Sequence, residues 1–598
     1  MLRHRVQHLR RRLARHAWLS DLPAMLAWAA IVGVSAAFTT IGFHRGMHLI
    51  QHLATGDSGS IVAVMTALPW YGRLLFPALG GLAAGLLLWL AARLSAGQAA
   101  DYMEAVAIGD GRLSLGHGLL RSGSSLLTVA SGGSIGREGA MVHLGAMAAS
   151  AIGRFARFST FRLRLLVACG AAAGVAAAYG APLAGALFVA EIVLGSMAMQ
   201  SLGPLLIAAA SANLTMRMTG HYQSIYAMPG LVSVEGLALL PFVALGLIAG
   251  LAAPAFLKVL ALARTVFRRS GLALPWRLGL GGALLGLVLI WHPEVAGNGY
   301  SVVSALLHDP WSWQLVVLVL ALKVLATALT VGSGAIGGVF TPALFVGAAL
   351  GTLLGMGMDW LWPELGIPLP MATLVGMGSF LGAATSAPLM ALLMIFEMSL
   401  SYQIVLPLMM ACVVAYFVSR AVAEVAMYDV TRVRAHHERM RQQFSHTTLD
   451  ALIRPATTVV RPADSVRAVM DMFVENPVRT VYVVDEDNVY QGAIARQDLT
   501  RLMLNDSGAS DRPATEVLRR DYVRSLHKDM TLVRAQEYFV QHQGERLPVV
   551  SREARPRLLG VVYKSAVLEK YSGLKRDPDL GGEAFVPSRR RAGRRKAP

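Results

Sequence analysis

The stretch SGGSIGREGAMVHLGA, residues 131–146, places a carboxylate, Glu138, next to a guanidinium, Arg137, in an otherwise small and apolar segment. Its glycines allow the backbone to approach a ligand closely and to present consecutive N–H groups. The apolar residues that follow predict a helix starting at Gly136–Gly139, with unpaired N–H groups and the positive end of the helix dipole at its start. Such a helix start binds anions. We therefore expect Gly136, Arg137 and Gly139 to form part of an anion site.

Glu138 is the residue of this stretch that can respond to its surroundings. A carboxylate beside an anion site competes with the anion, and once protonated it would withdraw. A charge at the centre of a bilayer costs about 2.5–3.5 kcal/mol or more, so an ionisable residue there indicates function. The alternative is an ion pair with Arg137, but neighbouring residues on a helix do not face each other.

The sequence repeats these features. GSIGREG at 133–139 matches GAIGGVF at 334–340, and APLAGALFVAE at 181–191 matches APLMALLMIFE at 387–397, which gives offsets of 201 and 206 residues. Duplicated halves with broken helices are typical of a transporter or channel whose binding site lies between the halves.

In the second half, the backbone amides of Val339 and Phe340 would open a helix toward the same point as the first. No lysine or arginine is needed there, which suits an anion that must also leave. Glu191 and Glu397 hold equal places in the two halves, and this favours a packing or capping role for both. Lys323 is a candidate buried partner for one of the acids.

The composition indicates a membrane protein. The chain has 598 residues, of which 55% are hydrophobic and 15% charged, whereas soluble domains carry about 25% charged residues. Apolar segments follow one another from about residue 24 to 427, several of them too short or too interrupted for a simple span. They lie at 24–43, 74–93, 162–194, 236–264, 276–291, 314–331 and 403–423.

Charge and cysteine content narrow the classes further. The net charge of +18 gathers at the two ends: six of the first fifteen residues are arginine, and the chain ends in SRRRAGRRKAP. The positive-inside bias places both ends in the cytoplasm. Neither end carries interleaved aromatic residues, so nucleic-acid binding is not expected. Cys169 and Cys412 lie in apolar surroundings, which favours core packing over a disulfide or a metal site.

From about residue 430 the sequence becomes charged and mixed in pattern. Two copies follow of a strand, a polar turn, a second strand beginning at glycine and a helix. The expected domains are a basic cytoplasmic arm (1–20), an all-α transmembrane domain (21–430, halves 21–220 and 235–430), a linker (431–450), two α/β copies (451–506 and 511–572) and a basic disordered tail (573–598).

At this point the motifs resemble a known family. GREGAMVHLGA resembles the GREGP motif of the CLC chloride channel and transporter family, GGVFTP resembles its GxFxP motif, and MYDVTRVR resembles its pore-tyrosine segment. The C-terminal copies resemble tandem CBS domains. The resemblance implies a homodimer in a bacterial inner membrane, with one chloride pathway per subunit. It also implies that Glu138 is the external gating glutamate, that Val339 and Phe340 offer backbone amides, and that Tyr428 offers a hydroxyl at the inner gate.

The departures from the family pattern bear on mechanism. GQAAD at 97–101 replaces the GSGIP loop, so Gln98 stands where a serine is usual and Asp101 adds an acid near the inner mouth. Ile192 stands where proton-coupled members carry a second glutamate, and an isoleucine cannot carry a proton. These changes favour a channel. A chloride/proton antiporter and, because of Gln98, a fluoride-selective transporter stay as alternatives.

The CBS signature is also incomplete. It requires a serine or threonine and an aspartate after a glycine, but the first copy has Gly492, Ala495 and Asp498, and the second has Gly560, Tyr563 and Ala566. Adenine-nucleotide binding is therefore expected only through Asp498, and a dimer-stabilising scaffold is the alternative role. No other cofactor is expected.

Two other classes of protein, a membrane sensor and a membrane enzyme, make different predictions. A CBS-domain membrane sensor without transport would show no anion flux at all. A membrane-embedded enzyme is not expected, because the membrane segments contain neither HExxH nor G-x-S-x-G.

Overall fold

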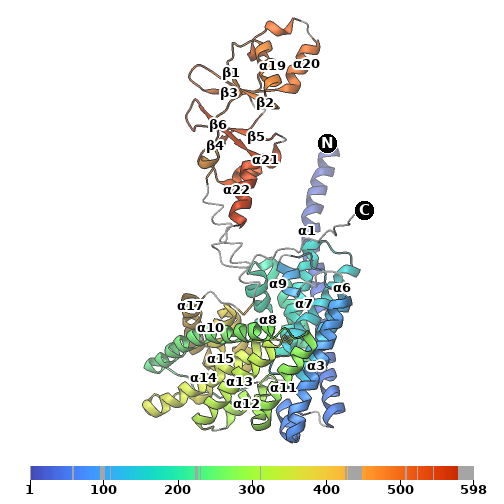
Figure 1. Cartoon of the computed structure of the whole chain (residues 1–598), viewed down its shortest axis with the longest axis vertical. Helices are drawn as coiled ribbons and strands as arrows, with labels where there is room; N and C mark the ends of the chain where they lie inside the picture. Colours follow the sequence, from blue (N-terminus) through green and yellow to red (C-terminus); the bar gives the residue numbers. More distant parts are fainter. Residues whose placement is uncertain are drawn as a thin grey trace, which may run out of the picture. The chain divides into compact units, whose positions relative to one another are not determined.

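The computed structural model describes residues 2–56, 59–94, 101–107, 109–222, 226–228, 230–309, 311–423, 427–428, 448–505, 508–520, 523–542 and 544–576. The chain forms two compact units, Met1–Arg432 and Val433–Pro598 (Figure 1). The predicted all-α membrane domain followed by an α/β domain is confirmed by the order of the elements.

The helices of the first unit follow the chain in this order: α1 (Leu2–Thr55), α2 (Ile61–Ala67), α3 (Trp70–Leu94), α4 (Tyr102–Ala107), α5 (Leu115–Ala130), α6 (Glu138–Phe155), α7 (Thr160–Tyr179), α8 (Pro182–Leu187), the π-helix η1 (Phe188–Leu194), α9 (Met199–Met218), η2 (Gly236–Leu239), α10 (Leu240–Arg269), α11 (Leu274–Trp291), η3 (Pro293–Val295), α12 (Tyr300–His308), α13 (Trp313–Gly332), α14 (Phe340–Leu361), η4 (Pro363–Leu365), α15 (Leu369–Thr385), α16 (Pro388–Ser399), η5 (Tyr402–Ile404) and α17 (Val405–Val422).

Eight segments of the described chain are long and apolar enough to cross a membrane. They are Pro23–Thr55, Trp70–Arg93, Thr160–Tyr179, Gly236–Arg269, Leu274–Trp291, Trp313–Gly332, Phe340–Leu361 and Tyr402–Val422. Three apolar helical segments are shorter: Pro182–Leu194, Leu369–Thr385 and Pro388–Ser399. Short helices of this kind need other protein around them to satisfy their backbone ends.

The two halves share one order of helices. The series α5, α6, α7, α8 and α9 corresponds to α13, α14, α15, α16 and α17. Within each series α6 packs on α7 as α14 packs on α15, and α7 packs on α9 as α15 packs on α17. The sequence duplication is therefore also a duplication of packing.

Matched glycines allow the closest of these contacts. A Cβ on Gly145 of α6 would lie 2.5 Å from the carbonyl oxygen of Gly170 on α7, and the reverse substitution at Gly170 would collide with the oxygen of Gly145. In the second half Gly347 of α14 and Gly376 of α15 approach each other in the same reciprocal way. Both helix pairs thus meet backbone to backbone at equivalent places.

The second unit contains two three-stranded sheets, ordered β1-β2-β3 and β4-β5-β6. In each, the first two strands pair in parallel and the last two antiparallel. The first copy consists of η6 (Asp450–Leu452), β1 (Val459–Val460), α19 (Val466–Glu475), β2 (Thr480–Val484), β3 (Tyr490–Ala495) and α20 (Arg496–Asn505). The second consists of η7 (Ala509–Asp511), η8 (Ala514–Glu516), β4 (Leu526–His527), α21 (Leu532–Gln541), β5 (Arg546–Val550), β6 (Leu558–Tyr563) and α22 (Lys564–Arg576).

The two copies exchange backbone contacts. Arg454, which precedes the first copy's sheet, forms a bridge with Val561 of β6, and Arg519, which precedes the second, forms one with Ala493 of β3. Two details differ from the sequence expectation. The second strands begin at Tyr490 and Leu558, two residues before Gly492 and Gly560, and α22 continues to Arg576, past residue 572. Most of the predicted linker and tail (429–447 and 577–598) lies outside the described residues.

Candidate anion pathway

The two Gly-rich loops pair directly with each other. The N–H of Gly136 donates to the carbonyl of Gly338 at 2.7 Å, and the N–H of Gly338 donates to the carbonyl of Gly136 at 2.9 Å. This isolated antiparallel bridge sits immediately before α6, which begins at Glu138, and α14, which begins at Phe340. The starts of two helices, with their unpaired amides, are thereby held beside one bridge.

Glu138 is buried at 3% exposure, and its side chain turns back over this bridge. A Cβ on Gly136 would collide with Oε2 of Glu138, and a Cβ on Gly338 would lie 3.5 Å from the same atom. Oε1 accepts a 2.8 Å hydrogen bond from the hydroxyl of Tyr300, the first residue of α12. Oε2 has no partner in the described part of the chain. The carboxylate therefore lies beside the starts of α6 and α14, where the sequence predicts an anion site.

Arg137 does not pair with Glu138 in the described structure. Its guanidinium carbon lies 5.4 Å from the ring centroid of Tyr300, and its buried Nε finds no partner among the described residues. The ring of Tyr226 packs edge-on against Tyr300 at 6.0 Å, and the hydroxyl of Tyr226 is likewise buried without a partner there. Tyr300 is thus surrounded by polar groups but donates its hydroxyl to Glu138.

Tyr300 is the residue of this site that the sequence reasoning missed. It follows the polar, Gly-rich segment AGNG at 296–299, an interruption between apolar helices that was the available signal. Lys323 of α13 holds this segment in place: its Nζ donates to the carbonyls of Val295 and Gly297 at 3.0 and 2.7 Å. The expectation that Lys323 pairs with an acid is wrong, because backbone carbonyls and the nearby Phe345 ring surround its ammonium group.

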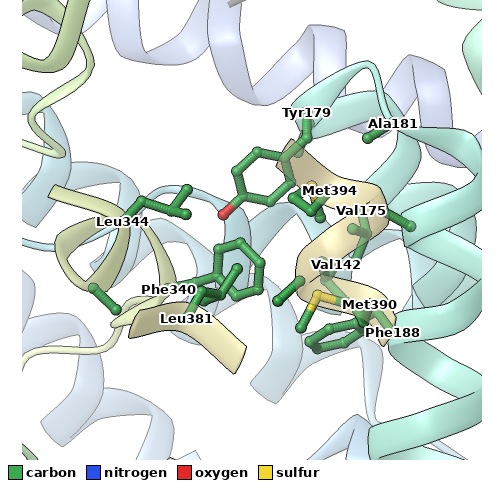
Figure 2. Packing of buried hydrophobic residues seen from close by; sticks show 14 of the residues in the cluster. Val142, Val175, Tyr179, Ala181, Phe188, Phe340, Leu344, Leu381, Met390 and Met394 are labelled. Atoms are coloured by element: carbon green, nitrogen blue, oxygen red, sulfur yellow. The ribbon is translucent and has the colours of Figure 1, made fainter. Parts of the chain in front are cut away.

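A series of aromatic rings leads from this site to Tyr428. Tyr179, at the end of α7, lies 5.1 Å from Phe340, which lies 6.4 Å from Phe188 of η1. Phe188 in turn lies 5.7 Å from Tyr428. Figure 2 shows Tyr179, Phe340 and Phe188 in one packed cluster with apolar side chains from α15 and α16. The structure therefore brings Phe340 and Tyr428 into one cluster, while Gln98 lies outside the described residues.

Ile192 is buried at 1% exposure in the π-helix η1, next to Glu191. Glu191 accepts a hydrogen bond from the N–H of Met390 at 2.9 Å, in the first turn of α16. Glu397 accepts from the N–H groups of Leu183 and Ala184 at 3.0 and 2.9 Å, in the first turn of α8. Each half therefore caps a short helix of the other, and the predicted capping role of both acids is confirmed.

His143, on the same helix as Glu138, forms a second titratable pair with Asp101. His143, buried on α6, has its Nδ1 4.0 Å from Oδ1 of Asp101, which directly precedes α4. The His143 ring also packs against Tyr102 at 6.2 Å. The side chain of Asp101 is 45% exposed.

In the second unit, Asp498 accepts a 2.8 Å hydrogen bond from Nη2 of Arg519. Its side chain is 12% exposed, and Oδ2 has no partner among the described residues. An arginine of the second copy therefore already pairs with one oxygen of the carboxylate through which adenine-nucleotide binding was expected. No cluster of three metal-ligating side chains occurs among the residues that the structure describes.

Comparisons with known proteins agree with this architecture. The family model for voltage gated chloride channels matches residues 80–420, and the CBS domain model matches 450–505 and 514–573. A ClcB-like chloride channel protein of Ralstonia nicotianae is 49% identical over 427 residues, covering 70% of this chain and 98% of that protein. The voltage-gated ClC-type chloride channel ClcB of Escherichia coli is 42% identical, covering 67% of this chain and 96% of that protein.

Solved structures show the same fold. A slow cyanobacterial chloride/proton antiporter aligns with a TM-score of 0.61 at 24% identity, over 69% of this chain and 97% of that one. A CLC-type fluoride/proton antiporter aligns with a TM-score of 0.57 at 25% identity, over 69% and 98% of the two chains. A eukaryotic CLC transporter aligns over 92% of this chain and 98% of that one, with a TM-score of 0.58 at 17% identity.

Proposed function

Because this chain belongs to the voltage-gated chloride channel family and carries tandem CBS domains, we propose that its chloride transport is channel-like and gated by Glu138. The observation that carries the proposal is the Glu138 carboxylate folded over the Gly136–Gly338 bridge with Oε2 unpartnered in the described chain. In this position the carboxylate competes with chloride for the amides at the starts of α6 and α14. Neutralisation of Glu138 removes that competition.

The passive mechanism is supported by Ile192. Its buried alkyl side chain offers no proton site on η1. Anion contacts are assigned to the backbone amides of Arg137, Gly139, Val339 and Phe340, to the Tyr428 hydroxyl and to Gln98. The predicted contact through Gly136 is corrected, because its N–H donates to the Gly338 carbonyl. A site made largely of backbone dipoles holds an anion weakly enough to release it.

The test is flux from chloride-loaded vesicles with simultaneous chloride and pH electrodes. We expect wild-type chloride flux without stoichiometric proton movement. Glu138→Gln should give faster flux that no longer varies with pH, because the amide carries no competing charge. Glu364→Gln, an exposed acid far along the chain in η4, is the control and should behave as wild type. Absence of chloride flux from the wild type would leave only a sensor role.

A chloride/proton antiporter is the second candidate, and the Asp101–His143 pair favours it. His143 lies five residues after Glu138 on α6, about 7.5 Å along the helix axis. A proton entering at the half-exposed Asp101 could pass to His143 without using position 192, but residues five apart project about 140° apart on a helix, so a water-mediated step would have to complete the transfer to Glu138. Stoichiometric proton uptake by the wild type, lost in His143→Asn with chloride flux retained, would establish this candidate. A fluoride electrode in the same vesicles tests fluoride selectivity.

We further propose a homodimer in a bacterial inner membrane with both termini in the cytoplasm. The bacterial relatives and the arginines of the N-terminal arm support the location and orientation. Photobleaching of a singly labelled protein in vesicles should show two steps per particle. A single step would contradict the dimer.

The CBS pair is assigned a scaffold role. Asp498 is already paired with Arg519, and Ala495, Tyr563 and Ala566 do not restore the missing polar groups of the signature. Titration calorimetry of the full chain with ATP, ADP and AMP should give no binding tighter than about 1 mM, the weak limit of ordinary ligand recognition. Tighter binding that Asp498→Asn abolishes would restore the nucleotide-sensor role.

A further inference from the structure

A cleft of about 480 Å³ opens in the membrane unit, away from Glu138 and the aromatic series. Its walls come from the last turns of α10, the start of α11 and the end of α13 with the loop that follows it. The lining residues are Ala261, Arg264, Thr265, Arg268, Arg277, Val331, Gly332, Gly334 and Ala335. Three of these nine side chains are guanidinium groups, and none is acidic.

Two of the arginines are available for a ligand. Arg264 and Arg268 stand four residues apart on α10, so they project from one face of the helix, and both are exposed. No carboxylate pairs with either of them in the described part of the chain. The third, Arg277, is anchored, because its Nε donates to the carbonyl of Ser333 at 2.7 Å. Gly334 makes room for it, since a Cβ there would lie 2.7 Å from Nη2.

The surroundings of the cleft have the features of a membrane interface. Trp276, beside Arg277 at the start of α11, is 65% exposed, and tryptophan gathers at the level of lipid headgroups. Leu262 and Val266 alternate with the cleft arginines on α10, so they project from another side of that helix, and they are 65% and 58% exposed. Apolar side chains exposed on a membrane helix face acyl chains. The cleft arginines and Trp276 therefore lie at the level where the bilayer surface meets the acyl chains.

We propose that this cleft binds the phosphate group of an anionic phospholipid. Guanidinium groups form paired hydrogen bonds with phosphate oxygens, and basic pockets between membrane helices are suited to anionic headgroups. The end of α10 carries Arg268 and Arg269, and the start of α11 carries Arg277. The positive-inside bias places this end of both helices on the cytoplasmic side. Because Arg277 also fastens the loop that leads to α14, a bound lipid would steady the second Gly-rich loop.

The test is native mass spectrometry of the full chain in mild detergent, titrated with dioleoyl phosphatidylglycerol or dioleoyl phosphatidylcholine. We expect the wild type to retain phosphatidylglycerol preferentially. The double variant Arg264→Gln with Arg268→Gln should bind it on the order of tenfold more weakly, from about 1 kcal/mol per basic residue. Arg277 is left intact because it supports Ser333. Arg269→Gln is the control: it removes one charge from the same helix outside the cleft, and it is compared with the single variants Arg264→Gln and Arg268→Gln, each of which removes one charge from inside the cleft.

Each outcome decides the proposal. Equal loss in Arg269→Gln and in the two single cleft variants would overturn it, since general surface charge would then explain the binding. Unchanged binding in the double variant would also overturn it. In a parallel arm, 10 mM inorganic phosphate, on the order of a weak ligand's dissociation constant, replaces the lipid. If the wild type retains inorganic phosphate, the double variant does not, and neither prefers phosphatidylglycerol over phosphatidylcholine, the ligand is a soluble phosphate and the lipid proposal is overturned. None of these outcomes depends on chloride flux.

Discussion

The hydroxyl of Tyr300 donates a 2.8 Å hydrogen bond to Oε1 of Glu138, across 162 residues of sequence. A donor to a carboxylate stabilises its charged form. Tyr300 therefore holds the carboxylate over the Gly136–Gly338 bridge, in the position from which we propose that it competes with chloride. The gate of the proposed pathway is a pair of residues rather than a single acid.

Tyr300→Phe should open this gate more often. It keeps the ring but removes the donor, and a hydrogen bond to a charged group contributes about 1.5–3 kcal/mol. We expect chloride flux from vesicles to rise by about ten- to a hundredfold. Tyr226→Phe is the control: its ring packs on Tyr300, but its hydroxyl touches no partner in the described chain, so flux should not change.

A double variant tests whether Tyr300 acts through Glu138 or has only a structural role. In a Glu138→Ala background there is no carboxylate to hold, so adding Tyr300→Phe should change nothing. A further change of the same size in that background would show that Tyr300 acts elsewhere.

The contrast between Glu397 and Tyr300 shows how far the sequence predicts the site. Glu397 repeats Glu191 within matched motifs, so a shared role could be inferred from position alone, and the helix starts at Glu138 and Phe340 follow from glycine and apolar patterns. Tyr300 belongs to no motif, and Lys323 binds the Val295 and Gly297 carbonyls of the segment that leads to it. Long-range hydrogen bonds of this kind depend on tertiary packing, which local patterns do not encode.

The reciprocal caps should stabilise the junction of the two halves. Glu397→Ala removes the acceptor for the Leu183 and Ala184 amides at the start of α8. Loss of such a cap costs about 0.5–2 kcal/mol, so the melting temperature in detergent should fall. Glu397→Gln retains one oxygen that can accept a hydrogen bond, so its melting temperature should fall less. Equal losses in the two variants would mean that the negative charge, and not an acceptor oxygen at this position, explains the effect.

The close helix contacts make Gly347→Ala destabilising. Its Cβ would lie only 2.4 Å from the carbonyl oxygen of Gly376, and no side-chain rotation can relieve this contact because the oxygen belongs to the backbone of α15. Overpacking of this kind costs about 1–3 kcal/mol. Gly357→Ala lies on the same helix, with nothing within 4 Å of the added atom. It should be neutral or stabilising by up to about 1 kcal/mol from helix propensity. Opposite signs in thermal unfolding are the expected result, and a matching loss in both variants would contradict it.

Arg546 should hold the two CBS copies together. From β5 of the second copy, its buried guanidinium donates to the Thr480 carbonyl at 2.7 Å and to the Thr458 hydroxyl of the first copy. Its Cζ lies 5.3 Å from the centroid of the Tyr482 ring. Arg546→Met fills similar space but leaves those oxygens buried without a donor, at a cost of about 1–3 kcal/mol.

The measurement is the rate of proteolysis in the C-terminal unit of the full chain, which should rise in Arg546→Met. Arg552→Met is the control, because Arg552 pairs with Asp529 at the surface, where both side chains are more than half exposed. Surface pairs contribute only about 0–1 kcal/mol, so this variant should be cut at nearly the wild-type rate. If both variants are cut alike, the contacts of Arg546 across the two copies do not stabilise the pair.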